Sequence, residues 1–235
     1  MQKDFIFKGK KIRVELSSDA DVSVFNEIFI EKEYRLVEQV IEKSNAAIID
    51  IGAHIGLFSI YASFLNGDIK ILAFEPDENN FSLMKENISL NHLKNVTMKS
   101  SAVAGKTGER ILYVGQDSHN HSLLKLPGVL KEKKVYATDM NKIFSKNLRE
   151  MGVSNCDLVK MDCEGAEFEI LPSLSSEIFS SIGSFFIEYH KFQEEWREED
   201  LSNILRKHNF RVQIFPSRYD GRMGLIWAYR HIFPS

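Results

Sequence analysis

The segment IIDIGAHIG, residues 48–56, contains residue types at a spacing that suits ligand binding. An apolar run ends at Asp50 and continues through Gly52 and Gly56 into a helical stretch. Glycines in such a strand-to-helix turn let the backbone approach a ligand closely, and the helix N–H groups point at that ligand. The two glycines are four residues apart with His54 between them, so the three-glycine spacing of dinucleotide-binding turns is absent. The segment predicts a cofactor-binding turn, with a tight structural connection as the alternative.

Glu75 supports a cofactor that contains a nucleoside. It ends the next apolar run, KILAFE, and lies 19 residues after Gly56. A carboxylate at that position can accept both hydrogen bonds of a ribose diol. The alternative is that Glu75 only caps the helix that begins near Asp77.

Carboxylates also follow a third apolar run, in the segment KMDCEGAEFEIL at residues 160–171. Because the carboxyl ends of parallel strands border one crevice, Asp162 and Glu164 are expected to face the crevice that Asp50 borders. Such a concentration of carboxylates suits a cationic ligand. Glu167 is instead expected in the first turn of the following helix, where the helix dipole favours negative charge.

A fourth apolar run, FFIEYH, contains Glu188 and ends at His190. These residues are two apart on a strand, so their side chains share a face and are expected to line the same crevice. His190 is the best-placed candidate for a general base, because imidazole titrates near physiological pH. The alternative is a histidine that only makes a local hydrogen bond.

Two further histidines, His119 and His121, suggest a metal site that Asp162, Glu164 and Glu188 could complete. The patterns that support a metal centre are an H-E-x-x-H motif or cysteines at zinc-ligand spacing, and the sequence contains neither. Histidines in loops are commonly unliganded. The sequence therefore predicts no bound metal.

Short apolar runs alternate with helical stretches from residue 46 onward, and this alternation positions the candidate residues. Strands separated by helices of about ten residues form β-α-β units, which build a parallel sheet with right-handed crossovers. The last segment has two strand-like runs around a Tyr-Asp-Gly-Arg turn and predicts an antiparallel hairpin. The expected strands are 46–51, 70–75, 95–100, 156–162, 184–190 and the two halves of 210–230, and the expected helices include 57–65 and 79–91.

The expected organisation is an N-terminal appendage, residues 1–44, followed by one domain over residues 45–235. The appendage would contain a hairpin around a Lys-Gly-Lys turn and an amphipathic helix over residues 33–43. Residues 105–139 place two strand-like runs around a polar stretch, which predicts an inserted hairpin or loop over one edge of the sheet. A chain of 235 residues is long enough for this arrangement.

The composition excludes several classes of protein. With 43% hydrophobic and 27% charged residues, the chain is neither collagen-like nor disordered. The 30 Lys and Arg against 33 Asp and Glu leave a net charge of −3, so no global positive field favours nucleic acid or anionic lipid. With two cysteines, no apolar leader and glycines within the apolar run at 46–65, a cytoplasmic protein without a membrane span is expected.

Taken in order, the segments IIDIGAHIGLFS, FEPDENNFSLMKENISLN, SSAVAG, KMDCEGAEFEIL and IEYH resemble the FkbM family of methyltransferases. This family is a branch of the class I methyltransferases, which use S-adenosylmethionine, and the resemblance runs from about Glu33 to His190. It implies a Rossmann-like α/β fold with a seven-stranded, mostly parallel sheet and an antiparallel C-terminal strand, here with a small N-terminal hairpin and helix added.

The resemblance implies binding roles for residues at four strand ends. These are Asp50, Gly52, His54 and Gly56 around the methionine part of the cofactor, Glu75 with the adjoining Pro76 at the ribose, Ser101 and Ala102 beside the adenine, and Asp162 and Glu164 toward the sulfonium and amino group. The chemistry of S-adenosylmethionine agrees, since it carries a ribose diol, an ammonium and a sulfonium. A phosphate-rich dinucleotide would favour fewer carboxylates.

The resemblance also implies O-methylation of a small molecule or a saccharide. In-line displacement at the sulfonium depends mainly on alignment of the acceptor, and His190, Glu188 or Glu164 would take the proton of an acceptor hydroxyl. Two alternatives stay open. Arginines near the C-terminus suggest an RNA methyltransferase, although the acidic net charge opposes nucleic acid as a partner. The strand, glycine and acid pattern also fits a dinucleotide-dependent oxidoreductase or a nucleotide-binding regulator, but the third glycine is missing.

Overall fold

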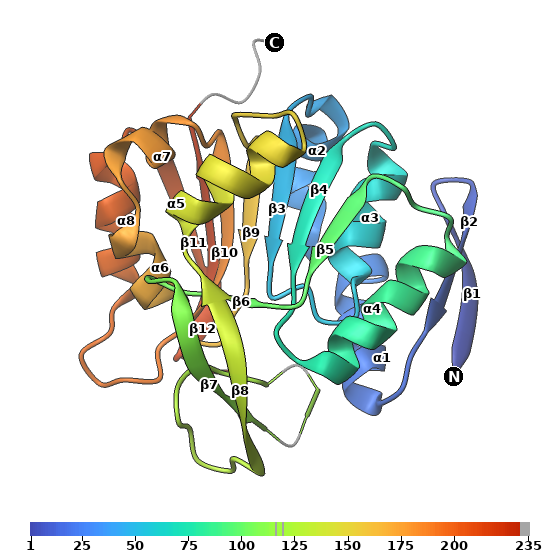
Figure 1. Cartoon of the computed structure of the whole chain (residues 1–235), viewed down its shortest axis with the longest axis horizontal. Coiled ribbons are helices and arrows are strands. Elements are labelled where there is room, and N and C mark those ends of the chain that lie inside the picture. The colour runs from blue at the N-terminus through green and yellow to red at the C-terminus, as the bar shows by residue number, and fades with distance from the viewer. Residues whose placement is uncertain (116, 119, 231–235) are drawn as a thin grey trace.

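Seven strands form the central sheet of this computed structural model, which describes residues 1–115, 117–118 and 120–230 (Figure 1). Their order across the sheet is β11-β12-β10-β9-β3-β4-β5, and all neighbours from β10 to β5 are parallel. Strand β12 is antiparallel to both β10 and β11, as the sequence predicted for the C-terminal hairpin. The bounds are β3 (Ala47–Ile51), β4 (Lys70–Phe74), β5 (Val96–Lys99), β9 (Leu158–Met161), β10 (Ser184–His190), β11 (Arg211–Pro216) and β12 (Met223–Tyr229).

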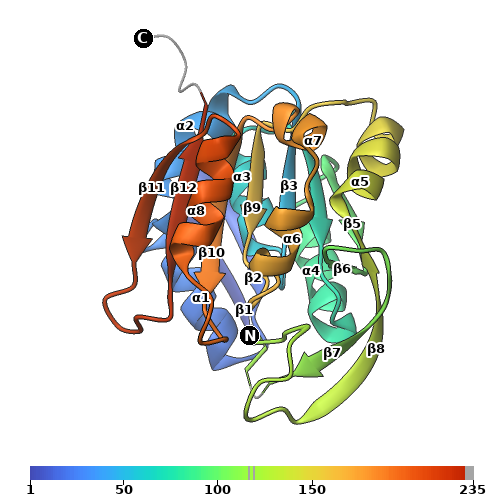
Figure 2. The same ribbon diagram turned by 90° about the vertical axis from the view of Figure 1, so that its left-hand side faces the viewer.

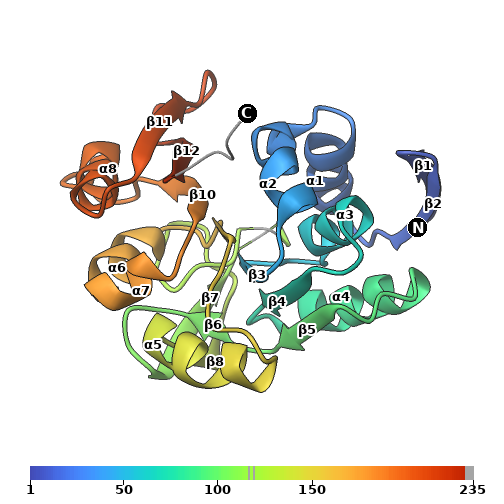
Figure 3. The ribbon, with the colours of Figure 1, turned by 90° about the horizontal axis from the view of Figure 1, so that it is seen from above.

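Helices cover both faces of this sheet (Figure 3). The strands are apolar on both sides, so alternate residues pack into two separate clusters. Ile48 joins the cluster under the N-terminal helices, whereas Ile49 joins the cluster on the opposite face. One face carries α1 (Asp19–Phe29), a short 3-10 helix (Glu33–Val37), α2 (Glu38–Lys43), α3 (Leu57–Leu65) and α4 (Glu78–Leu90), and the other carries α5 (Met140–Lys142), the π-helix that continues it (Ile143–Leu148), α6 (Glu167–Ser173), α7 (Ser176–Ser180) and α8 (Glu198–Lys207).

The N-terminal residues form the expected hairpin, β1 (Gln2–Phe7) and β2 (Lys10–Glu15). It packs at the outer side of α4, where Asn87 and Asn91 accept hydrogen bonds from the backbone of β2 (Figure 3). The expected helix over residues 33–43 is divided into the 3-10 helix and α2. Sequence reasoning missed α1, although Ser18 and Asp21 form a capping box at its start. Apolar side chains of residues 1–44 share one cluster with the sheet, and a boundary at residue 44 stays a prediction.

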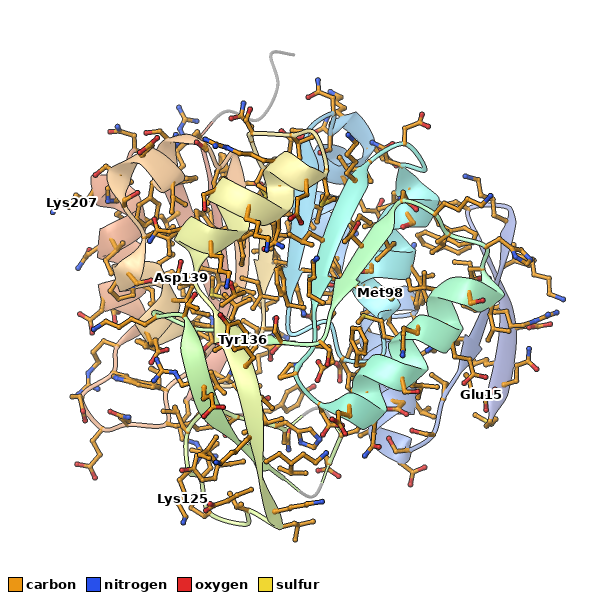
Figure 4. The ribbon with its side chains drawn as sticks, viewed as in Figure 1. Glu15, Met98, Lys125, Tyr136, Asp139 and Lys207 are labelled. Atoms are coloured by element: carbon orange, nitrogen blue, oxygen red, sulfur yellow. The ribbon has the colours of Figure 1, made fainter. Side chains whose placement is uncertain are left out.

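The two strands expected within residues 105–139 form a second sheet together with a short strand that precedes them, three strands in all. It has the order β6-β8-β7, with β6 (Ala102–Val103), β7 (Gly108–Val114) and β8 (Lys131–Thr138). Figure 2 shows β7 and β8 extending past the ends of β9 and β10. In Figure 4, Lys125 lies at the outer end of this insertion and Asp139 lies where the chain returns toward the central sheet. The insertion is therefore placed beside the edge where the parallel strands end.

The long apolar run at residues 46–65 is divided between β3 and α3. Within the described part of the chain, no helix has the length and apolar character needed to cross a membrane.

Candidate active site

The turn after β3 brings three strand ends together. Strands β3, β4 and β9 are parallel neighbours, and the N–H groups of Gly52 and Ala53 donate to the Phe74 carbonyl oxygen at 3.1 and 2.9 Å. Gly52 has a φ of +73°, and a Cβ atom there would lie 1.7 Å from the carbonyl oxygen of Asp162. Only glycine fits at such a position, which explains the first glycine of the motif in physical terms.

A cavity opens at this edge, and we call it the turn cavity. Of the ten predicted cofactor-binding residues, three are outside its described lining: Asp50 is fully buried, Gly56 precedes α3, and Ser101 precedes β6. The other seven line the cavity, namely Gly52, His54, Glu75, Pro76, Ala102, Asp162 and Glu164.

Glu75 is buried at the end of β4, with 5% of its surface exposed. Its two carboxylate oxygens accept hydrogen bonds from the N–H groups of His54 and Asp77, both at 2.9 Å. The cap of α4 is Asp77, whose carboxylate accepts from the N–H groups of Asn79 and Asn80, so capping does not explain Glu75. Burial raises the pKa of Glu75 to about 7.

Asp50 is buried beneath the glycine turn and holds it through Ser59 and Lys160. Its carboxylate accepts a hydrogen bond from the Ser59 hydroxyl at 2.7 Å and lies 3.3 Å from Nζ of Lys160. Lys160 donates to the Gly52 carbonyl oxygen at 2.7 Å and lies 3.8 Å from the carboxylate of Asp162. Burial alone would lower the pKa of Lys160, but the two carboxylates raise it. Lys160 was not predicted from the sequence as a site residue. Its position as the one charged residue inside an apolar strand could have indicated a buried ion pair.

Glu164, Glu188 and His190 meet beside the turn cavity, as the sequence predicted from their strand ends. The Nε2 atom of His190 is 3.7 Å from Oε1 of Glu164 and 3.6 Å from Oε1 of Glu188. Burial raises the pKa of Glu164 to about 7, and burial together with Asp162 raises the pKa of Glu188. Burial alone would lower the pKa of His190, but Glu167 and the other two carboxylates raise it to about 10.

A second and wider cavity adjoins the first. We call it the insertion cavity, because residues of the insertion between Tyr113 and Val129 form one wall. The opposite wall includes Glu33, Glu188 and His190. Residues shared by both cavities mark their junction, and they include Tyr34, Asp162 and Glu164.

Ser118 joins the insertion to the turn cavity, and sequence reasoning missed this contact. The Ser118 hydroxyl donates to Asp21 at 2.8 Å and lies 3.0 Å from Nε2 of His54. The side chain of Asn80 donates to the Ser118 carbonyl oxygen at 2.7 Å. Burial would raise the pKa of Asp21, but His54 and hydrogen bonds from Ser17 and Ser118 hold it well below its usual value. One loop residue thus binds α1, the glycine turn and α4 together.

His119 and His121 were considered as metal ligands in the sequence. His121 lines the turn cavity. His119 lies outside the described residues.

Comparison with known proteins gives a family match. The model of the methyltransferase FkbM domain matches residues 50–212. Methyltransferase sdnD of Sordaria araneosa is 26% identical over 192 residues, which cover 70% of this chain and 73% of that protein. Methyltransferase 1 of Beauveria bassiana is 26% identical over 185 residues, which cover 70% of this chain and 72% of that protein.

Two solved structures share the fold. Methyltransferase FkbM from Methylobacillus flagellatus KT has a TM-score of 0.53 at 15% identity over 79% of this chain, and this chain spans 44% of that one. Magnesium protoporphyrin IX methyltransferase from Synechocystis PCC 6803, with bound S-adenosylmethionine, has a TM-score of 0.52 at 12% identity over 92% of this chain and 86% of that one. At these identities the likeness concerns the fold.

The order of the seven strands, with its antiparallel β12, defines a class I methyltransferase fold. Since the family model covers more than half of the sequence, the chain belongs to the FkbM methyltransferase family and is an S-adenosylmethionine-dependent methyltransferase.

Proposed function

We propose that this methyltransferase methylates a hydroxyl oxygen of a small molecule or saccharide. The cofactor would occupy the turn cavity and the acceptor the insertion cavity. The observation that carries the proposal is the junction of the two cavities at Tyr34, Asp162 and Glu164. Methyl transfer requires the acceptor, the methyl group and the sulfur to lie in line, and two adjoining cavities with a common border allow this alignment.

The residues of the turn cavity fit the chemistry of S-adenosylmethionine, which supplies an electrophilic methyl group when bound. The carboxylate of Glu75 has lone pairs left for a ribose diol after accepting two backbone hydrogen bonds. Phe74 and Leu123 offer an apolar wall to an adenine ring. Asp162 and Glu164 would face the ammonium and sulfonium, whose positive charges the carboxylates stabilise.

A hydroxyl acceptor must lose its proton as the methyl group is transferred. Glu164, Glu188 and His190 all line the insertion cavity beside its junction with the turn cavity. Glu164 and Glu188 are therefore placed to take that proton, whereas His190, whose pKa is raised to about 10, carries its proton at neutral pH and would orient the hydroxyl oxygen as a hydrogen-bond donor. The alignment, rather than the strength of the base, is expected to supply most of the acceleration.

The charge of the insertion cavity supports a small polar acceptor over RNA. Its lining contains the carboxyl groups of Glu27, Glu33 and Asp117, and these would repel a phosphate backbone. Arg222 also lines it, but this guanidinium is paired with Asp220 at 2.7 Å. Arg230 packs over the Phe210 ring instead of joining a basic surface.

The proposal is tested by incubating the purified chain with radiolabelled S-adenosylmethionine and a panel of sugars, hydroxy acids and polyketide-like alcohols, with bulk tRNA and simple amines in parallel. Label on a hydroxyl oxygen of a small molecule is the expected result. Transfer to tRNA or to nitrogen, with the hydroxyl compounds unlabelled, would contradict it. Calorimetry with S-adenosylhomocysteine and with NAD tests the proposed cofactor separately, and binding of S-adenosylhomocysteine but not of NAD is expected.

A further inference from the structure

A group of side chains at the junction has the composition of a metal centre. Asp162, Glu164 and His190 each offer one ligand atom, and these atoms lie within 4.8 Å of one another. The group combines two carboxylates with an imidazole, and the carboxylate of Glu188 lies 3.6 Å from the same imidazole nitrogen. All four residues line the insertion cavity.

The separations of these atoms differ from those of direct hydrogen bonds. A charge-assisted N–H to carboxylate hydrogen bond brings the two atoms to about 2.7–2.9 Å. Ligand atoms bonded at about 2.0–2.2 Å to a shared cation lie about 3–4 Å apart. The Nε2 atom of His190 is 3.7 Å from Glu164 and 3.6 Å from Glu188, which fits ligands around a common centre.

The orientation of His190 is an independent observation. The residue is 5% exposed, its Nε2 atom faces two carboxylates, and its buried Nδ1 atom has no hydrogen-bond partner among the described residues. On the Nδ1 side, Oε1 of Glu167 lies at 3.9 Å. That carboxylate is itself fixed by the N–H groups of Cys163 and Gly165. A metal-binding histidine commonly has a carboxylate on the side of its second ring nitrogen, and Glu167 lies on that side of His190, so that Nε2 faces the group.

We propose that Asp162, Glu164 and His190, with Glu188 as a fourth ligand, bind a divalent cation at the junction. The proton that His190 carries beside these carboxylates in the metal-free chain is released to solvent as the cation binds. A set rich in carboxylates suits Mg²⁺ and Mn²⁺, and the imidazole favours Mn²⁺ between these two. Four protein ligands leave octahedral positions open toward the insertion cavity. We further propose that an oxygen of the methyl acceptor occupies one of these open positions. This second step rests on the function proposed above, whereas binding of the cation does not depend on that function.

The ligands of the proposed site come from distant parts of the sequence. The sequence suggested a metal through His119 and His121, two residues apart in the insertion, with Asp162, Glu164 and Glu188 as possible further ligands. No bound metal was predicted, because an established ligand motif is absent. The group found here takes its imidazole from β10 and two carboxylates from the end of β9, so its ligands are separated by more than 20 residues (162 to 190). Only the parallel pairing of β9 with β10 brings them together.

The test is titration of the full-length, EDTA-treated chain with MnCl₂, in which the electron paramagnetic resonance signal of free Mn²⁺ is followed. We expect one saturable site per chain. Glu164→Gln and His190→Ala should each weaken binding by at least about tenfold. Glu188→Gln, which is nearly isosteric, tests the fourth ligand by the same assay.

Two matched variants separate coordination from general negative charge. Glu27→Gln removes a carboxylate that lines the same cavity outside the group, and Glu177→Gln removes an exposed one on α7. Both should bind Mn²⁺ as the native chain does. No saturable binding by the native chain, or equal loss in Glu27→Gln and Glu164→Gln, would overturn the proposal. Melting curves confirm that each variant is folded, and S-adenosylhomocysteine calorimetry in EDTA tests the proposed function separately.

Discussion

The turn cavity and the insertion cavity are built in different ways. The first is formed mainly by backbone turns at adjacent strand ends, although Ser118, His121 and Leu123 of the insertion also line it. Its key carboxylate, Glu75, already accepts two hydrogen bonds. The second gathers side chains from distant segments, and its carboxylates face His190 at distances beyond hydrogen bonding. A cavity fixed by backbone suits a ligand of constant shape. A cavity lined by an insertion allows the ligand to differ between relatives, because loops vary without disturbing the sheet.

The largest expected effect is at Gly52, where two backbone segments of the turn cavity approach each other closely. Gly52→Ala would place a Cβ atom against the Asp162 carbonyl at a positive φ, so the turn must move. We expect a loss of about 3 kcal/mol or more in the free energy of unfolding and no measurable S-adenosylhomocysteine binding. Chemical denaturation and calorimetry provide the measurements.

Gly221→Ala is the matched control, since nothing lies within 4 Å of a Cβ atom at that position. Its effect should stay within about 0.5 kcal/mol. If Gly52→Ala were equally mild, the backbone would not define the turn cavity.

The next effect concerns the carboxylate of Glu75. Glu75→Ala removes the acceptor for both the His54 and Asp77 N–H groups as well as for a ribose diol. We expect the affinity for S-adenosylhomocysteine to fall by at least about 100-fold, which corresponds to about 2.7 kcal/mol. Glu78→Ala, in the exposed first turn of α4, should leave the affinity unchanged. Equal affinity of Glu75→Ala and the native chain would refute the assignment.

Strand ends and the glycine turn could be predicted because they depend on local sequence. The buried runs, Gly52 and Glu75 follow one another along the chain, and their hydrogen bonds are made within this stretch. Asp50 could not be assigned from local sequence in the same way. Its carboxylate faces Lys160 rather than the cavity, and Lys160 reaches it only because β9 packs beside β3. The contacts of Ser118 and the pairing of His190 with Glu164 join segments too distant for any periodic pattern to reveal.

A smaller effect is expected from pH. Burial raises the pKa of Glu75 from 4.5 to about 7, so the carboxyl group is increasingly protonated as the pH falls below about 7. The ionised form accepts hydrogen bonds from a ribose diol, and the affinity for S-adenosylhomocysteine should therefore fall with decreasing pH, by about tenfold per unit below pH 7. Calorimetry across this range measures the dependence. Glu75→Gln should remove it, and a profile that the substitution leaves intact would assign the titration to another group.

The smallest expected effect lies at Ser118, the contact between the insertion and the turn cavity. Ser118→Ala removes the hydroxyl that binds Asp21 and lies beside His54, but it keeps the backbone contact with Asn80. One lost hydrogen bond is worth about 1 kcal/mol, so S-adenosylhomocysteine should dissociate about fivefold faster in stopped-flow measurements. Ser180→Ala, on the exposed surface of α7, is the control. Unchanged dissociation would mean that the loop does not restrain the ligand.

The most direct test of the account is a crystal structure of the chain with S-adenosylhomocysteine. We expect the ligand to fill the turn cavity, with both ribose hydroxyls on the carboxylate of Glu75 and the sulfur at the junction beside Asp162 and Glu164, facing the insertion cavity. A ligand bound elsewhere, or one whose sulfur faces away from the insertion cavity, would contradict the division of the site into a cofactor side and an acceptor side.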